Sequence, residues 1–333
     1  MGNMTTRRII LAAVPDGLPK ETDFRLEAID APSCPEGGLL VRTQYISVDP
    51  YLRGRITGRK TYVDPILVGA PMESGAVGEV VESRAPGYQA GDTVTGMWSW
   101  QELVPLGIRG ARKVDPSAGP VTAEIGILGT TGLTAYFGLL EICHPKAGET
   151  LVVSGAAGAV GMVVGQIGKI LGCRVVGIAG TDTKLEYVRS LGFDAALSYR
   201  APDFGAQLAS ACPKGVDCYF DNVGGSITDT VLPLLNVFGR VSVCGQISMY
   251  NSTQVEIGPR PFPLMVVKQI RAEGFIVLRW ANRFAEGRKQ LAEWMKEGKL
   301  QNRETVFEGF ENTPKAFLGL FSGENTGKAI VKL

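Results

Sequence analysis

The chain contains 333 residues, of which 45% are apolar and 20% are charged, a composition typical of a folded globular protein with room for two domains. Its 34 lysines and arginines nearly balance its 33 aspartates and glutamates, so the sequence predicts neither a nucleic-acid nor an anionic-membrane partner. No apolar run approaches the ~20 residues of a membrane-spanning helix. The apolar stretch Ile9–Val14 is too short for a signal peptide, so we expect a cytoplasmic protein.

Cysteine and histidine are sparse and scattered. The chain has six cysteines and a single histidine, His144, and the cysteines come no closer than Cys212 and Cys218. Zinc sites usually draw several of these ligands from close spacings, and disulfide frameworks occur in short secreted chains. The sequence therefore predicts neither a metal site nor disulfides.

Residues 1–123 read as short strands separated by Gly/Pro turns. Strand candidates are Leu39–Thr43, Gly78–Glu82 and Thr93–Val94, with turns through Pro86–Gly87 and Gly91–Asp92. Such punctuation favours a small β-barrel-like domain.

Residues 124–298 follow a different pattern, in which buried strands alternate with helices. Leu133, Phe137 and Leu140 lie on one helical face, and a last helix carries Phe284 and Leu291. Alternation at this spacing predicts βαβ units and a doubly wound parallel sheet, that is, an α/β Rossmann domain. The predicted strands are Thr150–Ser154, Arg174–Ile178, Val216–Asp221, Arg240–Gly245 and Glu273–Leu278, and the predicted helices are Ala159–Leu171 and Thr181–Leu191. Residues 299–333 return to strand-like and loop character, so we expect this segment to fold back onto the first domain.

A glycine-rich turn joins the first of these strands to its helix. It contains Ala156-x-Gly158-x-x-Gly161 with an additional Gly155 upstream, a variant of the dinucleotide-binding G-x-G-x-x-G. Small residues let the backbone approach a pyrophosphate, whose charge then lies at the helix N-terminus. The alternative is a structural turn that needs glycine only for packing.

The end of the next strand distinguishes NADP from NAD. Sites that prefer NAD place an acidic residue there to bind the ribose 2′-hydroxyl. Here the strand ends in Ala179-Gly180-Thr181, and Lys184 follows in the first helical turn. A small residue with a nearby cation suits the 2′-phosphate of NADP, although Lys184 also fits a solvated helix face.

Several longer motifs lie in order along the chain: Val48–Arg53, Thr131–Tyr136, Ser154–Gly161, Cys218–Gly225, Cys244–Ser248 and Gly323–Lys328. Over nearly its whole length the chain resembles the zinc-independent medium-chain dehydrogenases/reductases, in the branch of prostaglandin reductase, plant alkenal double-bond reductases and bacterial curcumin reductase. The resemblance implies a GroES-like first domain, a homodimer, and NADPH as cofactor.

It also implies roles at matching positions. Residues Gly158, Ala159, Val160, Gly161 and Met162 would lie at the pyrophosphate, and Lys184 and Tyr199 at the 2′-phosphate. The ribose and nicotinamide would be lined by Asn222, Cys244, Gly245, Gln246, Ile247, Ser248, Tyr250, Phe275, Ile276 and Val277, with Asn325 reaching in from the tail.

The resemblance also bears on the reaction. Where zinc-dependent relatives have a cysteine and a histidine ligand, this chain has Ser47–Asp49 and Met72–Ser74. Without a Lewis acid, hydride addition to an activated C=C bond of an α,β-unsaturated aldehyde or ketone is favoured over alcohol oxidation, because hydrogen-bond donors can stabilise the enolate oxygen.

Two tyrosines are the candidate catalytic residues. Tyr51 would face the substrate carbonyl, or else it packs as an ordinary aromatic residue with a wet hydroxyl. Tyr250 would contact cofactor or substrate, with water as an alternative proton donor. The substrate is expected in the cleft between the domains. Two other functions remain open: a zinc-free quinone reductase and a non-catalytic NADPH-binding protein.

Overall fold

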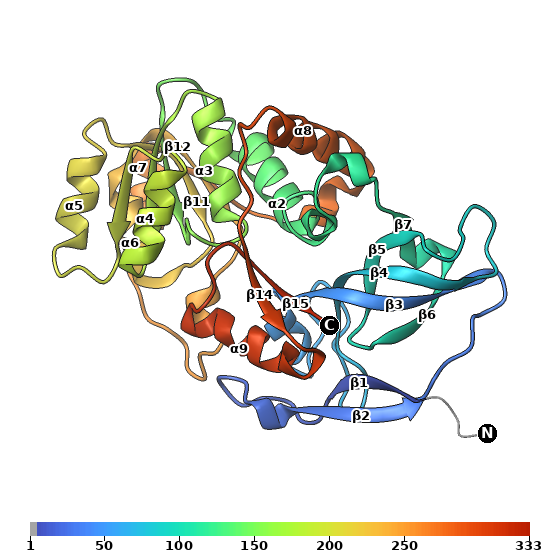
Figure 1. The fold of residues 1–333 in the computed structure, drawn as a ribbon. Helices are drawn as coiled ribbons and strands as arrows, with labels where there is room; N and C mark the ends of the chain where they lie inside the picture. The colour runs from blue at the N-terminus through green and yellow to red at the C-terminus, as the bar shows by residue number, and fades with distance from the viewer. Residues whose placement is uncertain (1–4) are drawn as a thin grey trace. The chain divides into compact units, whose positions relative to one another are not determined.

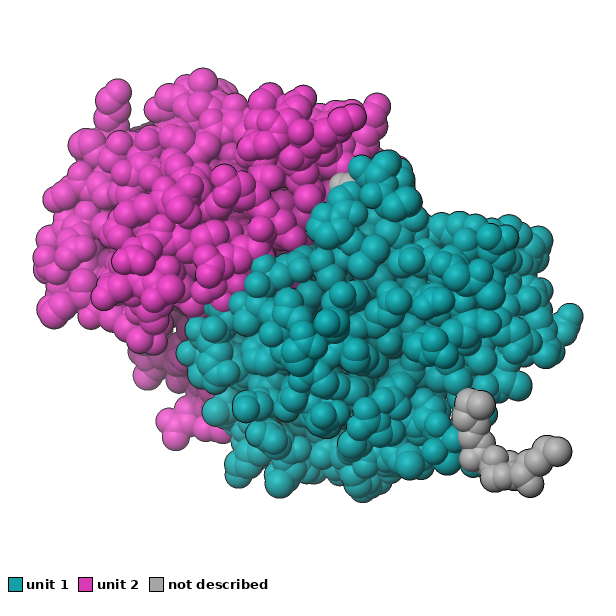
Figure 2. Space-filling model, viewed as in Figure 1, with its two compact units in different colours: residues 1–126, 304–325, 329–333 teal, residues 127–303, 326–328 magenta. Residues whose placement is uncertain are grey.

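The structure is a computed structural model that describes residues 5–333. Its chain divides into two compact units, coloured separately in Figure 2. The first comprises the chain up to Gly126 together with Glu304–Asn325 and Ala329–Leu333. The second comprises Ile127–Arg303 and Thr326–Lys328.

The first unit is built on a seven-stranded sheet in the order β14-β15-β3-β4-β5-β7, with β6 also paired to β3, and on a separate β1-β2 pair. Strand β3 pairs antiparallel with β4, β6 and β15. The elements are β1 Thr5–Leu11, β2 Phe24–Asp30, β3 Gly38–Ser47, α1 Leu52–Arg55, β4 Glu73–Ser83, β5 Thr93–Ser99, β6 Leu103–Gly107, β7 Ala111–Lys113, β14 Glu304–Glu308, α9 Thr313–Ser322 and β15 Lys328–Lys332.

The end of the chain is part of this first unit. Ile330 and Val331 in β15 lie opposite Ser47 and Ile46 in β3, and Phe317 on α9 is buried in the same apolar core. Figure 1 shows the red C-terminal segment beside the blue β3. The tail is not only strand and loop as expected, because α9 forms a ten-residue helix whose apolar face completes the core.

The second unit contains a six-stranded parallel sheet, so the predicted fold class is confirmed. Its strand order is β10-β9-β8-β11-β12-β13. The strands are β8 Thr150–Ser154, β9 Arg174–Ala179, β10 Ala195–Ser198, β11 Val216–Asp221, β12 Leu235–Val243 and β13 Arg271–Gly274. The helices are α2 Thr130–Gly138, α3 Gly161–Ile170, α4 Asp182–Ser190, α5 Phe204–Ala211, α6 Gly225–Val231, α7 Phe262–Lys268 and α8 Phe284–Lys296.

One predicted strand of this unit is largely wrong. The stretch Glu273–Leu278 was expected to be extended throughout, but β13 ends at Gly274 and a 3-10 helix begins at Val277. The half-buried Phe275 packs its ring against the buried Phe220 and Trp280. An apolar run gives the same sequence signal whether it is a strand or a segment anchored by one aromatic side chain.

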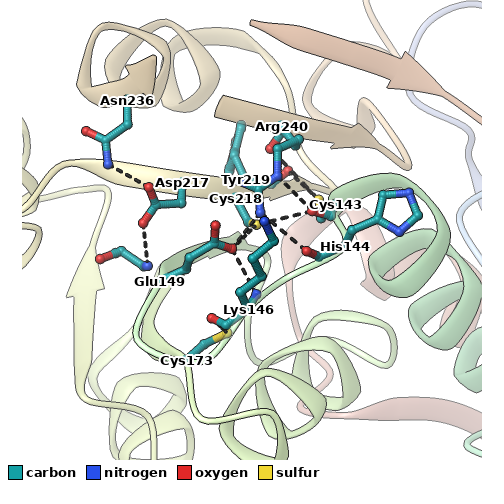
Figure 3. Close-up of polar contacts among 11 residues, drawn as sticks. Cys143, His144, Lys146, Glu149, Cys173, Asp217, Cys218, Tyr219, Asn236 and Arg240 are labelled. Carbon is teal, nitrogen blue, oxygen red and sulfur yellow. Dashed lines mark hydrogen bonds and ion pairs between the residues drawn. The ribbon is translucent and has the colours of Figure 1, made fainter. Parts of the chain in front are cut away.

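The amino ends of the parallel strands are joined by a polar cluster, shown in Figure 3. Glu149, just before β8, forms an ion pair with Arg240 of β12, and Arg240 Nε donates to the carbonyl oxygen of Cys143 at 2.8 Å. At the start of β11, Asp217 accepts hydrogen bonds from the Thr150 backbone and the Asn236 side chain. These contacts fix the strands at one edge of the sheet and leave the loops at the carboxyl edge available for a ligand.

Candidate functional site

The strand order places a binding site at one position in the second unit. The chain runs outward from β8 through β9 to β10, then returns to the other side of β8 and continues through β11, β12 and β13. In doubly wound sheets, ligands bind at the carboxyl ends of the strands where this order reverses. Here the reversal lies between β8 and β11, so the loops that begin at Ser154 and Asp221 border the site.

The glycine-rich turn follows β8 and leads into α3. Gly155 has a φ of 60°, which favours glycine, and the Gly158 backbone donates to its carbonyl oxygen at 2.9 Å. A Cβ on Gly161 would lie 2.3 Å from that same oxygen. The turn is therefore closed too tightly for a side chain at Gly161, and the amide groups at the start of the ten-residue α3 lie beside it. The predicted pyrophosphate residues Gly158, Ala159, Val160, Gly161 and Met162 all lie in this turn or in the first helical turn.

Residues from the chain's tail contact the turn as well. The Gly327 backbone donates to the carbonyl oxygen of Ala157 at 2.7 Å, and Gly158 and Gly327 form an isolated bridge. A Cβ on Gly327 would lie 2.1 Å from the carbonyl oxygen of Arg303. Asn325, which was expected at the nicotinamide, belongs to the first unit.

The predicted 2′-phosphate residues gather at the ends of β9 and β10. Thr181 caps α4 by accepting a hydrogen bond from the Lys184 backbone, and the Tyr199 backbone donates to the Ala179 carbonyl. The Tyr199 ring occupies the space that a side chain on Gly180 would need, because a Cβ there would lie 2.9 Å from the ring.

Sequence reasoning missed a second cation in this place. The Arg200 guanidinium lies 5.6 Å from the centre of the Tyr199 ring. Burial and, secondarily, the charge of Arg200 lower the pKa of Lys184. Two cations with an aromatic face are groups that could hold an anion, and a basic residue directly after Tyr199 was the available signal.

The predicted nicotinamide-side residues meet around the ends of β8, β11 and β12. Asn222 donates from Nδ2 to the Ser154 carbonyl oxygen at 2.7 Å and from its backbone to Ser154 Oγ at 2.9 Å. The backbone amides of Cys244 and Gly245 both donate to the Asp221 carbonyl oxygen, at 2.8 and 3.1 Å. Ser154 and Asp221 were not among the predicted site residues, although each ends a predicted buried strand at the expected edge.

The segment after β12 turns back over the β11 loop. Ser248, in the short 3-10 helix Ile247–Met249, donates from Oγ to the Val223 carbonyl oxygen at 2.7 Å. The Tyr250 hydroxyl accepts from the Gln246 backbone at 3.3 Å. Burial raises the pKa of the Tyr250 hydroxyl, and it raises the pKa of the Cys244 thiol to about 12, so that thiol stays protonated and is a poor nucleophile.

The other predicted residues of this group differ in their surroundings. Phe275 is half-buried and Ile276 is exposed in the connection after β13, whereas Val277, the first residue of the following 3-10 helix, is buried.

Tyr51 lies in the first unit, directly before the short helix α1, and packs partly buried against the apolar core. Burial and the charge of Asp49 raise the pKa of its hydroxyl well above the ordinary value, whereas the charge of Arg55 acts in the opposite direction. Arg55 forms an ion pair with Glu73 at 3.0 Å. The phenol is therefore held in its protonated form, which can donate a hydrogen bond.

In residues 5–333 no cluster of three or more His, Cys, Asp or Glu side chains is placed to hold a metal ion. Over the same part of the chain, no helix has the length and apolar character needed to cross a membrane.

The chain matches known proteins over nearly its full length. Residues 7–114 match a family described as the N-terminal domain of oxidoreductase, and residues 159–296 match one described as zinc-binding dehydrogenase. The NADPH-dependent curcumin reductase of Escherichia coli is 45% identical over 98% of this chain and 96% of its own. Prostaglandin reductase 1 of Oryctolagus cuniculus is 43% identical over 94% of this chain and 89% of its own. The crystal structure of CurA from Vibrio vulnificus in complex with NADPH, 39% identical, covers 98% of both chains with a TM-score of 0.92.

Proposed function

Because the chain belongs to the medium-chain dehydrogenases/reductases, in the branch of prostaglandin, alkenal and curcumin reductases, we propose that it reduces the C=C bond of α,β-unsaturated aldehydes and ketones with NADPH. The observation that carries this proposal is the convergence of the glycine turn with the loops after β11 and β12 at the switch point of the parallel sheet.

The residues of the second unit fit a dinucleotide. The glycine turn presents the amino end of α3 to a pyrophosphate, and it can close only because Gly161 has no Cβ to clash with the Gly155 carbonyl oxygen. The loops holding Asn222, Gly245 and Tyr250 would contact the ribose and nicotinamide. NADPH bound there would supply a hydride for the β-carbon of the substrate, and protonation of the α-carbon of the resulting enolate would complete the reduction.

The chain's own contribution to this step is a hydrogen bond to the enolate oxygen. The protonated Tyr51 hydroxyl donates it, which lowers the energy of the developing negative charge. The Tyr250 hydroxyl accepts from the Gln246 backbone, so its own proton can be donated to ribose or substrate.

The 2′-phosphate is held by Lys184, Tyr199 and Arg200, which sets the preference for NADPH over NADH. We expect Lys184→Ala to weaken NADPH binding by about tenfold, the value of one charge-assisted hydrogen bond, while NADH binding changes less than twofold. Lys289→Ala, at an exposed position of α8, is the matched control. Calorimetric titration with both cofactors measures the effect, and an equal loss for NADPH and NADH would remove Lys184 from the phosphate site.

The reaction itself is tested by following NADPH oxidation with a panel of enals and enones, with quinones and NADH as comparison reagents. Turnover of enones with NADPH preferred supports the proposal. Turnover of quinones alone would identify a quinone reductase instead. NADPH binding without any turnover would indicate a non-catalytic nucleotide-binding protein, since the fold alone does not determine function.

We also propose that the chain forms a homodimer through the outer edge of β13. This strand ends the sheet, and an unprotected edge strand can pair with a second copy about a two-fold axis. Large apolar side chains are exposed in the preceding segment, among them Val266 at 76% and Val267 at 77% on α7.

Val267→Glu is expected to shift the protein from dimer to monomer in size-exclusion chromatography with light scattering, because it places a charge among the exposed apolar side chains before β13 that the second copy would cover. Val306→Glu, at an exposed apolar position of β14, is the control and should leave the dimer intact. A monomeric wild-type protein, or a dimer unaffected by Val267→Glu, would contradict this interface.

A further inference from the structure

Asp221 is the most heavily hydrogen-bonded carboxylate at the carboxyl edge of the parallel sheet. It is the last residue of β11 and is only 1% exposed. Its Oδ1 accepts from Ser154 Oγ and the Tyr219 hydroxyl, both at 2.9 Å, and from the backbone amides of Val223 and Gly224, both at 3.0 Å. Its Oδ2 accepts from Thr228 Oγ1 at 2.6 Å and from Gln246 Nε2 at 3.0 Å.

These donors come from three separate segments. Ser154 ends β8 and begins the glycine turn, Val223 and Gly224 form the loop after β11, and Gln246 lies in the loop after β12. The backbone carbonyl oxygen of Asp221 also accepts hydrogen bonds, from the amides of Cys244 and Gly245. One buried residue thus ties together every loop that borders the switch point.

We propose that Asp221 is a positioning residue of the nucleotide site: its carboxylate holds the loops after β8, β11 and β12 in the arrangement that binds the ribose and nicotinamide half of the cofactor. The inference rests on the proposed function. Asp221 itself contacts neither cofactor nor substrate, because its oxygens are occupied by protein donors.

Asparagine at this position cannot replace the carboxylate. If the amide nitrogen took the place of Oδ1, it would face four hydrogen-bond donors. If it took the place of Oδ2, it would face the Gln246 amide nitrogen, which also donates to the Gly245 carbonyl oxygen at 2.9 Å. In either orientation the new NH2 group faces other hydrogen-bond donors, so hydrogen bonds are lost and the Gly245–Gln246 loop is held less firmly.

The strand supplies a matched control. Asp217 lies four residues earlier, at the amino end of β11, and accepts from the Thr150 backbone and the Asn236 side chain, away from the switch point. Asp217→Asn therefore makes the same chemical change in the same strand without touching the loops.

The test uses the full-length chain and two probes, NADPH and 2′,5′-ADP, in calorimetric titrations. The second probe carries adenosine with its 2′-phosphate and a 5′-phosphate, but it lacks the nicotinamide and the nicotinamide ribose. The proposed ligands of its 2′-phosphate, Lys184, Tyr199 and Arg200, follow β9 and β10. We expect Asp221→Asn to weaken NADPH binding by about tenfold or more and 2′,5′-ADP binding by less than about twofold. Asp217→Asn should leave both affinities within about twofold of the wild type, apart from any loss of stability.

Thr228→Val provides a second, milder variant that removes one donor from Asp221 without altering the loops themselves. It should weaken NADPH binding by about three- to fivefold, and it takes the place of Asp221→Asn in this test if that variant does not fold. Unchanged NADPH affinity in Asp221→Asn, or an equal loss for both probes, would overturn the positioning role. A wild-type chain that binds neither probe would instead refute the proposed function.

Discussion

Replacing Gly161 with alanine is expected to weaken NADPH binding by about 100-fold and to lower the stability of the second unit by about 1–3 kcal/mol. The added Cβ would lie 2.3 Å from the Gly155 carbonyl oxygen and 2.9 Å from the Ala156 Cα. Both are backbone atoms, so they can move only if the turn opens and the amino end of α3 shifts. Calorimetric titration with NADPH and thermal unfolding of the unliganded protein measure the two effects.

Two other glycines calibrate this result. Gly158→Ala should have a smaller effect, because its Cβ would lie 3.3 Å from the Gly155 carbonyl oxygen. Gly205→Ala in α5 meets only Thr230 Cγ2 at 3.6 Å and should leave NADPH affinity unchanged while slightly favouring the helix. If Gly161→Ala retained wild-type affinity, the turn would not be the pyrophosphate site.

Tyr51→Phe is expected to lower kcat/KM for enones by about 10- to 100-fold, the usual effect of removing one donor to a developing oxyanion. The substitution keeps the ring that packs against the core, so thermal unfolding should change little. Tyr45→Phe, a tyrosine at the edge of a small apolar cluster in the same unit, is the control and should retain activity. Wild-type kinetics in Tyr51→Phe would show that Tyr51 serves only in packing and that its hydroxyl has no part in the reaction.

The pH dependence gives an independent test of Tyr51. Because burial and Asp49 raise the pKa of its hydroxyl, the neutral, hydrogen-bond-donating form persists throughout the range in which an ordinary tyrosine, with a pKa of about 10, remains protonated. The kcat/KM of the wild type should therefore show no descending limb due to Tyr51 up to about pH 9.5. A limb that disappears in Tyr51→Phe would contradict this assignment.

The parallel sheet could be predicted from the sequence because its signals are local. Buried apolar runs bounded by glycine identify strands such as β8 and β11, whose bounds, Thr150–Ser154 and Val216–Asp221, agree with those expected. The Thr181 cap of α4 and the glycine turn are equally local, since each depends on backbone geometry within a few residues.

Other features of the fold and of the site depend on packing between residues that are far apart in the sequence. The segment after Gly274 is not a strand because the half-buried Phe275 packs against Phe220, which is distant in sequence, as well as against Trp280 in the following 3-10 helix. Arg200 joins Lys184 only because β10 lies beside β9. The position of Asp221 could be read from the sequence, but its role could not. Its hydrogen-bond donors extend from Ser154 to Gln246, and only the order of β8, β11 and β12 brings them around one carboxylate.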